Sequence, residues 1–314
     1  MKKKIWFTTV CLLMLMIVSG CGQNNKQPEK KEGLHITTTF YPVYIATLNV
    51  VDGVDGVEVE QIASNHTGCM HDYQLKPKDV VAMKEADLLV ANGAGMEQFI
   101  EDTLKENDID CIYLTDAHGL IKNEEHEEEH EHEEEEGHQH EEGEYNPHGF
   151  MNLSYYQKEV EYLAQELGKK DPENKEKYEE NAKNYIEKVE EIKKEMEETF
   201  SQENTSKKII ILHDAFFYFA EEFNLEVVDS LEVESDSGLS AKQIQELINR
   251  TKVSKAQMIL AEKQYSSQVA DTISKATDCE VYILDSCVTG EDDKDSYLNA
   301  MKSNLEMFKK ALAK

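Results

Sequence analysis

The chain has 314 residues, and its 64 Asp and Glu against 33 Lys and Arg give a formal net charge of −31 at pH 7. This acidic balance argues against nucleic acid as a partner, because phosphates would be repelled, and it is compatible with attraction of cations. The length is sufficient for two domains that each bury a core.

The N-terminus has the features of an exported lipoprotein. Residues 2–4 are three lysines, residues 5–18 form an apolar run too short to span a bilayer comfortably, and Val18-Ser19-Gly20-Cys21 follows. The pattern predicts a lipoprotein signal peptide at 1–20, a lipidated Cys21 and a flexible tether at 21–33. The body is then extracytoplasmic and anchored to the bacterial cell membrane by lipid. The alternatives are an ordinary secretory signal and an uncleaved anchor.

Short runs rich in β-branched residues alternate with helical patterns before and after a long charged helix. The expected strands are 35–39, 57–63, 87–92, 110–114, 208–212, 225–229, 257–261 and 280–284. Four strands in each half predict an α/β fold of two similar lobes with mostly parallel four-stranded sheets. We expect the N-terminal lobe at 34–170 and the C-terminal lobe at 206–314.

A long helix is predicted at 171–200, between the two lobes. Asp171 is expected as its N-cap, and Pro172 as its first residue. Apolar residues then recur at helical spacing, at Tyr178, Ala182, Tyr185, Ile186, Val189, Ile192 and Met196. A stripe of this width is typical of a helix packed on the body rather than on a second copy, so we expect a monomer with a rigid connecting helix and limited hinge opening.

Residues 124–144 form an almost pure Glu/His tract with thirteen glutamates and no Lys or Arg. Its histidines are His126, His130, His132, His138 and His140. Neutral imidazoles in a negative field can bind borderline cations weakly, so we interpret the tract as an auxiliary metal loop. The alternative is a solvated acidic loop without metal.

Four residues, His71, His148, His213 and Asp285, each follow an expected strand or the loop after it. Sheets of α/β proteins bind ligands beyond the carboxyl ends of their strands. Three imidazoles and one carboxylate suit a tetrahedral Zn²⁺ ion, with two ligands from each lobe. Taken singly, each histidine is more typical of a hydrogen-bonded packing residue.

An enzyme is the rival class, and the sequence argues against it. The chain has no HExxH, GxSxG or phosphate-loop motif. Four protein ligands also leave a tetrahedral ion no position for a reactive water. His35, His66 and His118 are expected in surface or turn positions, and Glu262 is expected near the site without being a ligand.

Several motifs in order resemble one known family across essentially the whole mature chain. They are His71-Asp72-Tyr73, Lys76-Pro77-Lys78-Asp79, Ala86-Asp87-Leu88-Leu89-Val90, Gly95-Met96-Glu97, Pro147-His148, His213-Asp214-Ala215-Phe216 with Tyr218, residues 240–247, Ala261-Glu262 and Leu284-Asp285-Ser286. They resemble the metal-binding lipoproteins of bacterial ABC importers, the cluster A-I solute-binding proteins, and among these the zinc-type ZnuA-like or AdcA-like members.

The resemblance implies a fold and a function. It implies two α/β lobes bridged by a long rigid helix, with a metal ion buried between them and handed to an ABC permease and its ATPase. The four ligand positions of the family fall on His71, His148, His213 and Asp285. Manganese-type relatives tend to have glutamate where this chain has His213, so Zn²⁺ is favoured over Mn²⁺. The alternatives are a manganese- or iron-type solute-binding protein and a metal-buffering surface adhesin.

The chain departs from the family pattern around two of these positions. Asn146 stands where the family commonly has an acidic residue, and Phe150 where it has tryptophan, so the support of His148 is in question. Cys69 and Cys287 lie two residues from expected ligands. They are candidates for a disulfide across the cleft, for thiolate ligands, or for plain packing residues.

Overall fold

The computed structural model describes residues 33–63, 70, 73–122, 145–201, 208–231, 240–263, 267–277 and 279–312. Outside these residues lie the signal peptide and tether, Cys21, Cys69, His71 and the Glu/His tract with His126, His130, His132, His138 and His140. Leu34–Lys314 form one compact unit. In the part of the chain that is described, no helix has the length and apolar character needed to cross a membrane.

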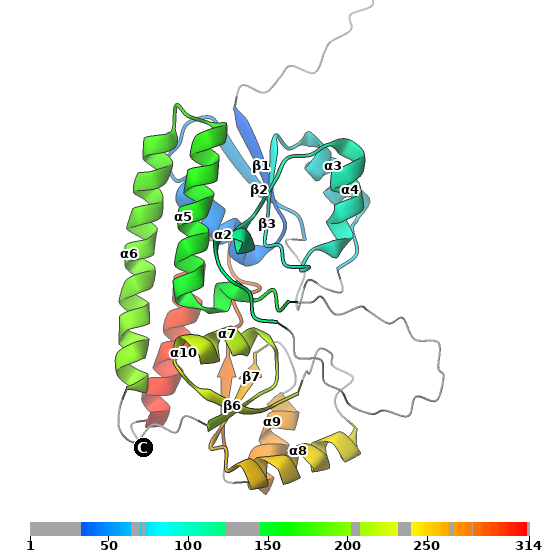
Figure 1. Ribbon diagram of the computed structural model, residues 1–314, viewed down its shortest axis with the longest axis vertical. Helices are drawn as coiled ribbons and strands as arrows, with labels where there is room; N and C mark the ends of the chain where they lie inside the picture. Colours follow the sequence, from blue (N-terminus) through cyan, green and yellow to red (C-terminus); the bar gives the residue numbers. More distant parts are fainter. Residues whose placement is uncertain are drawn as a thin grey trace, which may run out of the picture. The chain divides into compact units, whose positions relative to one another are not determined.

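The first half of the unit contains a four-stranded parallel sheet with the order β2-β1-β3-β4 (Figure 1). Its strands are β1 (Leu34–Thr38), β2 (Val57–Gln61), β3 (Leu88–Ala91) and β4 (Cys111–Tyr113). The helices of this lobe are α2 (Tyr41–Val50), α3 (Pro77–Glu85) and α4 (Glu101–Asn107).

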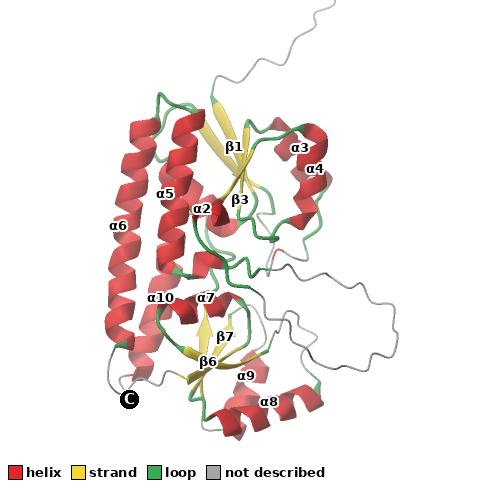
Figure 2. Ribbon diagram, viewed as in Figure 1, coloured by secondary structure: helices red, strands yellow, loops and turns green. Residues whose placement is uncertain are grey.

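The second half repeats this arrangement with the order β6-β5-β7-β8, again with all strands parallel (Figure 2). Its strands are β5 (Lys208–Ile211), β6 (Glu226–Ser230), β7 (Met258–Glu262) and β8 (Glu280–Leu284). Its helices are α7 (Ala215–Glu222), α8 (Ala241–Ser254), α9 (Ser267–Ala276) and α10 (Ser296–Leu312). The prediction of two similar lobes with four parallel strands each is therefore confirmed.

The central strands alternate their side chains between two apolar layers. In β5, Ile209 and Ile211 enter the large core shared by the two lobes, whereas Ile210 packs with the residues under α8 and α9. In β3, Val90 likewise faces the shared core and Leu89 faces the layer under α3 and α4. Both faces of each sheet are buried, which is why these strands read as continuous apolar runs in the sequence.

The second of two consecutive helices is the long connecting helix predicted between the lobes. These are α5 (Leu153–Lys170) and α6 (Lys175–Phe200), which pack side by side (Figure 1). The expected helix start at Asp171 and Pro172 is wrong, because Asp171 ends α5 and its N–H donates to Leu167 O (2.8 Å). The Asp171 carboxylate instead accepts from the Tyr178 hydroxyl (2.8 Å), which closes the turn between the helices.

One continuous core joins the lobes through these helices. It includes side chains from both sheets and from α5, α6, α7 and α10, among them Val90, Tyr156, Val189, Phe219 and Leu284. Opening the lobes like a hinge would expose this shared apolar surface to water, at a cost that scales with the area exposed. The shared core therefore favours a largely fixed relation between the two sheets.

Asn181 joins α6 to the first lobe through hydrogen bonds, and its substitution tests this connection. Its buried side-chain amide donates to Val50 O (2.9 Å) and to Asp52 O (2.8 Å), just beyond α2. Asn181→Ala leaves two carbonyls without these partners, and we expect the free energy of unfolding to fall by about 1–3 kcal/mol in urea denaturation.

The matched control is Asn184→Ala, an exposed asparagine on the same helix. Both substitutions make the same change in helix propensity. Equal effects of the two variants would contradict a clamping role for Asn181.

Candidate metal site

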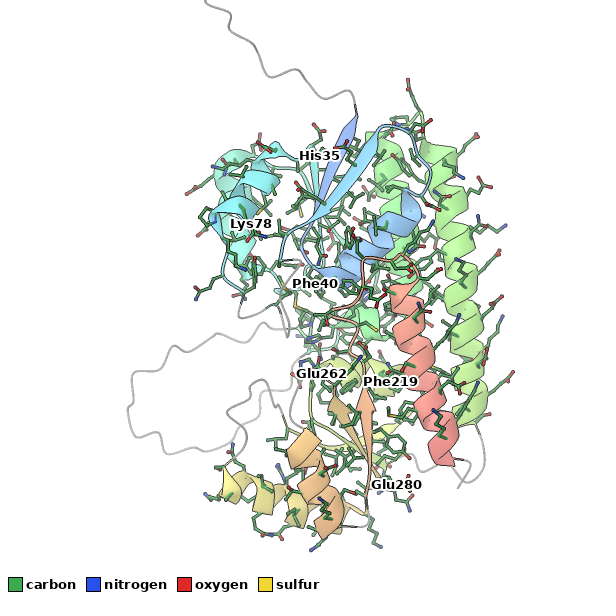
Figure 3. The ribbon with its side chains drawn as sticks, turned by 180° about the vertical axis from the view of Figure 1, so that it is seen from behind. His35, Phe40, Lys78, Phe219, Glu262 and Glu280 are labelled. Atoms are coloured by element: carbon green, nitrogen blue, oxygen red, sulfur yellow. The ribbon has the colours of Figure 1, made fainter. Side chains whose placement is uncertain are left out.

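The carboxyl ends of both sheets point toward the region between the lobes. Figure 3 shows His35, near the start of β1, and Glu280, the first residue of β8, toward the outer ends of the sheets, whereas Phe40 and Glu262 lie in the region between them. In parallel sheets ligands bind beyond the carboxyl ends, where the strand order reverses. That reversal lies between β1 and β3 in the first sheet, and between β5 and β7 in the second.

His213 and Glu262 lie side by side at the reversal point of the second sheet. His213 follows β5, and Glu262 is the last residue of β7. Their side chains are buried, and His213 Nε2 lies 3.7 Å from Glu262 Oε2. The two neighbouring strand ends thus present an imidazole and a carboxylate to the same space.

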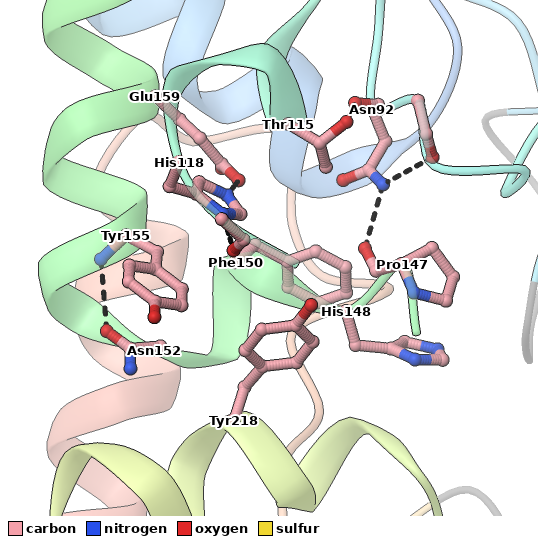
Figure 4. Close-up of polar contacts among 12 residues, drawn as sticks. Asn92, Thr115, His118, Pro147, His148, Phe150, Asn152, Tyr155, Glu159 and Tyr218 are labelled. Carbon is pink, nitrogen blue, oxygen red and sulfur yellow. Dashed lines mark hydrogen bonds and ion pairs between the residues drawn. The ribbon is translucent and has the colours of Figure 1, made fainter. Parts of the chain in front are cut away.

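His148 reaches this region from a loop held by the first sheet. Asn92, which follows β3, donates its side-chain amide to Pro147 O at 2.8 Å (Figure 4). Asn146 Oδ1 accepts from the His148 backbone N–H (3.0 Å) and lies 2.8 Å from His148 Nδ1. The carboxyl end of β3 therefore positions the backbone that presents His148.

The structure brings the His148 and His213 rings together. Their centroids are 5.1 Å apart and the rings are nearly perpendicular, at 72°. Both residues are only 2% exposed. Two buried imidazoles from different lobes, with a carboxylate beside one of them, are side chains of the kinds that bind a borderline divalent cation.

The imidazole of His213 accepts a hydrogen bond in this structure. The Ala215 N–H donates to His213 Nδ1 at 3.2 Å. In the neutral ring the proton is then on Nε2, which faces Glu262. A cation bound at Nε2 requires the opposite tautomer, so the contact with Ala215 has to lengthen or break on binding.

Asp285 follows β8, the strand next to β7. Its Oδ1 accepts from the Cys287 N–H (3.0 Å), and its Oδ2 lies 3.4 Å from Lys263 Nζ. Asn304 holds the Asp285 backbone through both its N–H and its carbonyl. The side chain is 20% exposed, so Asp285 is more accessible than the two histidines.

Glu262, at the end of β7, has a strongly perturbed carboxyl group. Burial raises the pKa of Glu262 to about 7, the Ser286 hydroxyl opposes this shift, and the negative charge of Asp285 adds to it. Its Oε1 accepts from Ser286 Oγ, whereas its buried Oε2 has no hydrogen-bond partner among the described residues. A cation nearby would favour the ionised form of this group.

Of the four expected ligands, His148 and His213 lie together, Asp285 lies at the end of a neighbouring strand, and His71 is outside the described residues. Among the residues that the structure describes, no group of three His, Cys, Asp or Glu side chains is arranged to hold an ion. Cys287 is buried, and burial together with the charges of Asp285 and Glu262 raises the pKa of its thiol in the metal-free protein. Cys287 is a free cysteine in this structure, which argues against the alternative of a disulfide with Cys69.

Tyr218 joins the lobes next to the site, and the sequence analysis did not assign it a role. Its buried hydroxyl donates to Asn146 O (2.7 Å) and accepts from the Ile121 N–H (2.9 Å). Lys122 and Tyr145 form an antiparallel bridge directly beside these contacts. A tyrosine on α7, five residues after His213, therefore holds both strands of the segment that leads into and out of residues 123–144.

His118 lies in a bend after residues 114–117, as expected, but its side chain is buried rather than at the surface. His118 Nε2 lies 2.7 Å from Glu159 Oε1, and the ring stacks on Tyr155 (Figure 4). A Cβ atom at Gly149 would come within 2.5 Å of this ring, so only glycine fits there. The partner of His118 lies 41 residues further along the chain, which explains why no local pattern indicated the pair.

A family model described as ZnuA, zinc-uptake complex component A periplasmic, matches residues 36–311. The chain belongs to this family. It is 32% identical to the high-affinity zinc uptake system protein ZnuA of Bacillus subtilis (strain 168) over 305 residues, which cover 95% of this chain and 94% of that protein. It is also 26% identical to the manganese ABC transporter substrate-binding lipoprotein PsaA of Streptococcus mitis over 329 residues, covering 99% and 100% of the two chains.

A solved structure supports the same relation. Zn(II)-bound AdcA from Streptococcus pneumoniae matches with a TM-score of 0.72 and 27% identity, over 90% of this chain and 58% of that chain. The protein is accordingly a metal-binding, substrate-binding component of an ABC importer and not an enzyme. Such components work with a permease and an ATPase.

The His118–Glu159 pair makes stability depend on pH. Burial lowers the pKa of His118, but the hydrogen bond and negative charge of Glu159 outweigh burial and raise it above the usual value. The pair therefore contributes its full stability below the usual histidine pKa of about 6.5, and this contribution is lost as the pH rises through the higher pKa of the folded protein.

We expect Glu159→Gln to lower the free energy of unfolding by roughly 2 kcal/mol at pH 6 and by much less at pH 9. Urea denaturation at both pH values measures the difference, with the exposed Glu161→Gln on the same helix as control. If Glu159→Gln lowers the free energy of unfolding equally at both pH values, the raised pKa of His118 is contradicted.

Proposed function

We propose that this protein captures Zn²⁺ between its two lobes and delivers it to the permease of an ABC importer. His148, His213 and Asp285 are the proposed ligands, together with His71, which lies outside the described residues. The observation on which this proposal depends most is the pair of buried imidazole rings, 5.1 Å apart, supplied by two different lobes. Neutral imidazole is a preferred zinc ligand, and burial keeps competing water away.

The charges around the rings support a divalent cation. Glu262 lies beside His213, and Asp285 follows the next strand. Burial, with a smaller contribution from the negative charge of Asp285, raises the pKa of Glu262, and a bound dication would favour the ionised form of this carboxyl group. Protonation of the histidines by acid would release the metal, because imidazole must be neutral to bind it.

The second candidate is Mn²⁺, which the similarity to the Streptococcus mitis protein PsaA favours. Manganese prefers carboxylate, carbonyl and water oxygens, whereas imidazole suits zinc. The side chains of His148 and His213 at the centre of the site therefore favour zinc.

Two further parts of the proposal concern residues outside the described ranges. The Glu/His tract at 124–144, with His126, His130, His132, His138 and His140, is proposed as an auxiliary loop that gathers zinc weakly. Cys21 is proposed as the lipidated residue that anchors the protein to the outer face of the cell membrane. In both respects the proposal rests on the sequence.

The ligand roles can be tested by zinc affinity. Loss of a single outer partner of a metal ligand typically costs about 10–100-fold in affinity, so His148→Ala or His213→Ala should each lose more than about 100-fold. Competition with a chromophoric chelator measures this loss, and a parallel titration with Mn²⁺ should show weaker binding in the wild-type protein.

The matched control is His35→Gln. His35 is the second residue of β1, at the end of the strand away from the site, and its Nε2 lies 3.3 Å from Glu58 Oε2. Its substitution should leave zinc affinity within about twofold of wild type, and deletion of 124–144 should cost less than either ligand variant. Equal losses for the deletion and for His148→Ala would contradict a site between the lobes.

A further inference from the structure

Asn146 is a buried residue whose polar atoms are all engaged. It is 2% exposed, its N–H donates to Ile121 O (2.9 Å), and its carbonyl accepts from the Tyr218 hydroxyl (2.7 Å). Its side chain contacts His148 on one side and Asp214 on the other. Asn146 therefore lies directly between the segments that present the two central histidines.

The orientation of the Asn146 amide follows from its neighbours. The backbone N–H of His148 can only donate, so the atom 3.0 Å away must be the amide oxygen. The carbonyl of Asp214 can only accept, so the atom 2.9 Å away must be the amide NH₂. These two contacts assign oxygen and nitrogen independently, and the assignments agree.

This orientation selects one tautomer of His148. The same amide oxygen lies 2.8 Å from His148 Nδ1, and an oxygen that cannot donate requires the proton on that ring nitrogen. The neutral ring then has its lone pair on Nε2, the nitrogen farther from Asn146. In metal sites the hydrogen bond to one ring nitrogen decides which nitrogen binds the ion.

The amide NH₂ links this histidine to the other lobe. Asp214 is the residue directly after His213, and its carbonyl accepts from Asn146 Nδ2. A carboxylate at position 146 could still accept from His148, but its second oxygen would face the Asp214 carbonyl at about the same distance and repel it. The two contacts together require one acceptor and one donor on the same short side chain, which asparagine has and aspartate lacks.

We propose that Asn146 is a positioning residue that fixes the tautomer of His148 and ties the His148 loop to the segment that begins with His213. The proposal rests on the proposed function, because it assumes a divalent cation bound by both histidines. Asn146 does so without adding a negative charge beside the imidazole of His148.

The first test uses the metal-free protein and does not depend on zinc binding. With ¹⁵N-labelled histidine, long-range ¹H–¹⁵N spectra distinguish a protonated ring nitrogen from an unprotonated one. We expect His148 to be protonated at Nδ1 in the wild type and in Asn146→Asp, and to exchange between both tautomers in Asn146→Ala. A wild-type ring protonated at Nε2 would overturn the proposal even if no variant folds.

The second test measures zinc affinity by chelator competition. Asn146→Ala should bind zinc about 10–100-fold more weakly. Asn152→Ala is the control, because Asn152 is also buried but caps α5 by accepting from the Tyr155 N–H (3.0 Å). It should lower stability and keep zinc affinity within about twofold.

The outcomes separate the two proposals. If Asn146→Ala keeps both the wild-type tautomer and an affinity within twofold of wild type, Asn146 has no positioning role. If instead His148→Ala binds zinc as tightly as the wild type, the proposed function fails, while the tautomer measurement still decides the role of Asn146. Asn146→Asp should also lower the melting temperature of the metal-free protein, and an unchanged value would contradict the link to Asp214.

Discussion

This protein depends on one constraint, which is that the carboxyl ends of the strands in its two sheets face each other. Each sheet alone offers only a row of loops at its carboxyl edge, and a chemically useful site requires the two rows to face each other at a fixed distance. The core shared by both sheets, α5, α6, α7 and α10 supplies that fixed distance. The meeting of the His148 and His213 rings is a consequence of this packing and not of any local sequence motif.

Burying such a site places many polar groups away from water, and each must be satisfied locally. At the point where the lobes meet, the side chains of Asn92, Asn146 and Tyr218 do this. Each forms a hydrogen bond with a main-chain atom of residues 146–148. Glu262 differs, because one of its buried oxygens has no hydrogen bond within the described residues and its pKa is raised to about 7. A buried carboxyl group with a raised pKa beside the imidazole of His213 is what a cation-binding site would be expected to contain before the cation arrives.

The sequence predicted the eight strands to within one or two residues, because strands buried on both faces appear as short β-branched runs. The predicted start of the long helix was wrong. Asp171 and Pro172 fit the start of a helix as well as they fit a turn between two helices, and α6 begins at Lys175. The position of His213 just after β5 was readable from order along the chain. The roles of Asn146 and His118 were not, because their partners Asp214 and Glu159 are 68 and 41 residues away and only the folded chain brings them close.

Crystals of the protein soaked in zinc give the most direct test of the account. Anomalous difference density at the zinc absorption edge should show a single strong peak within bonding distance, about 2.0–2.1 Å, of a ring nitrogen of both His148 and His213. Density confined to residues 124–144, with none between the two rings, would contradict the account.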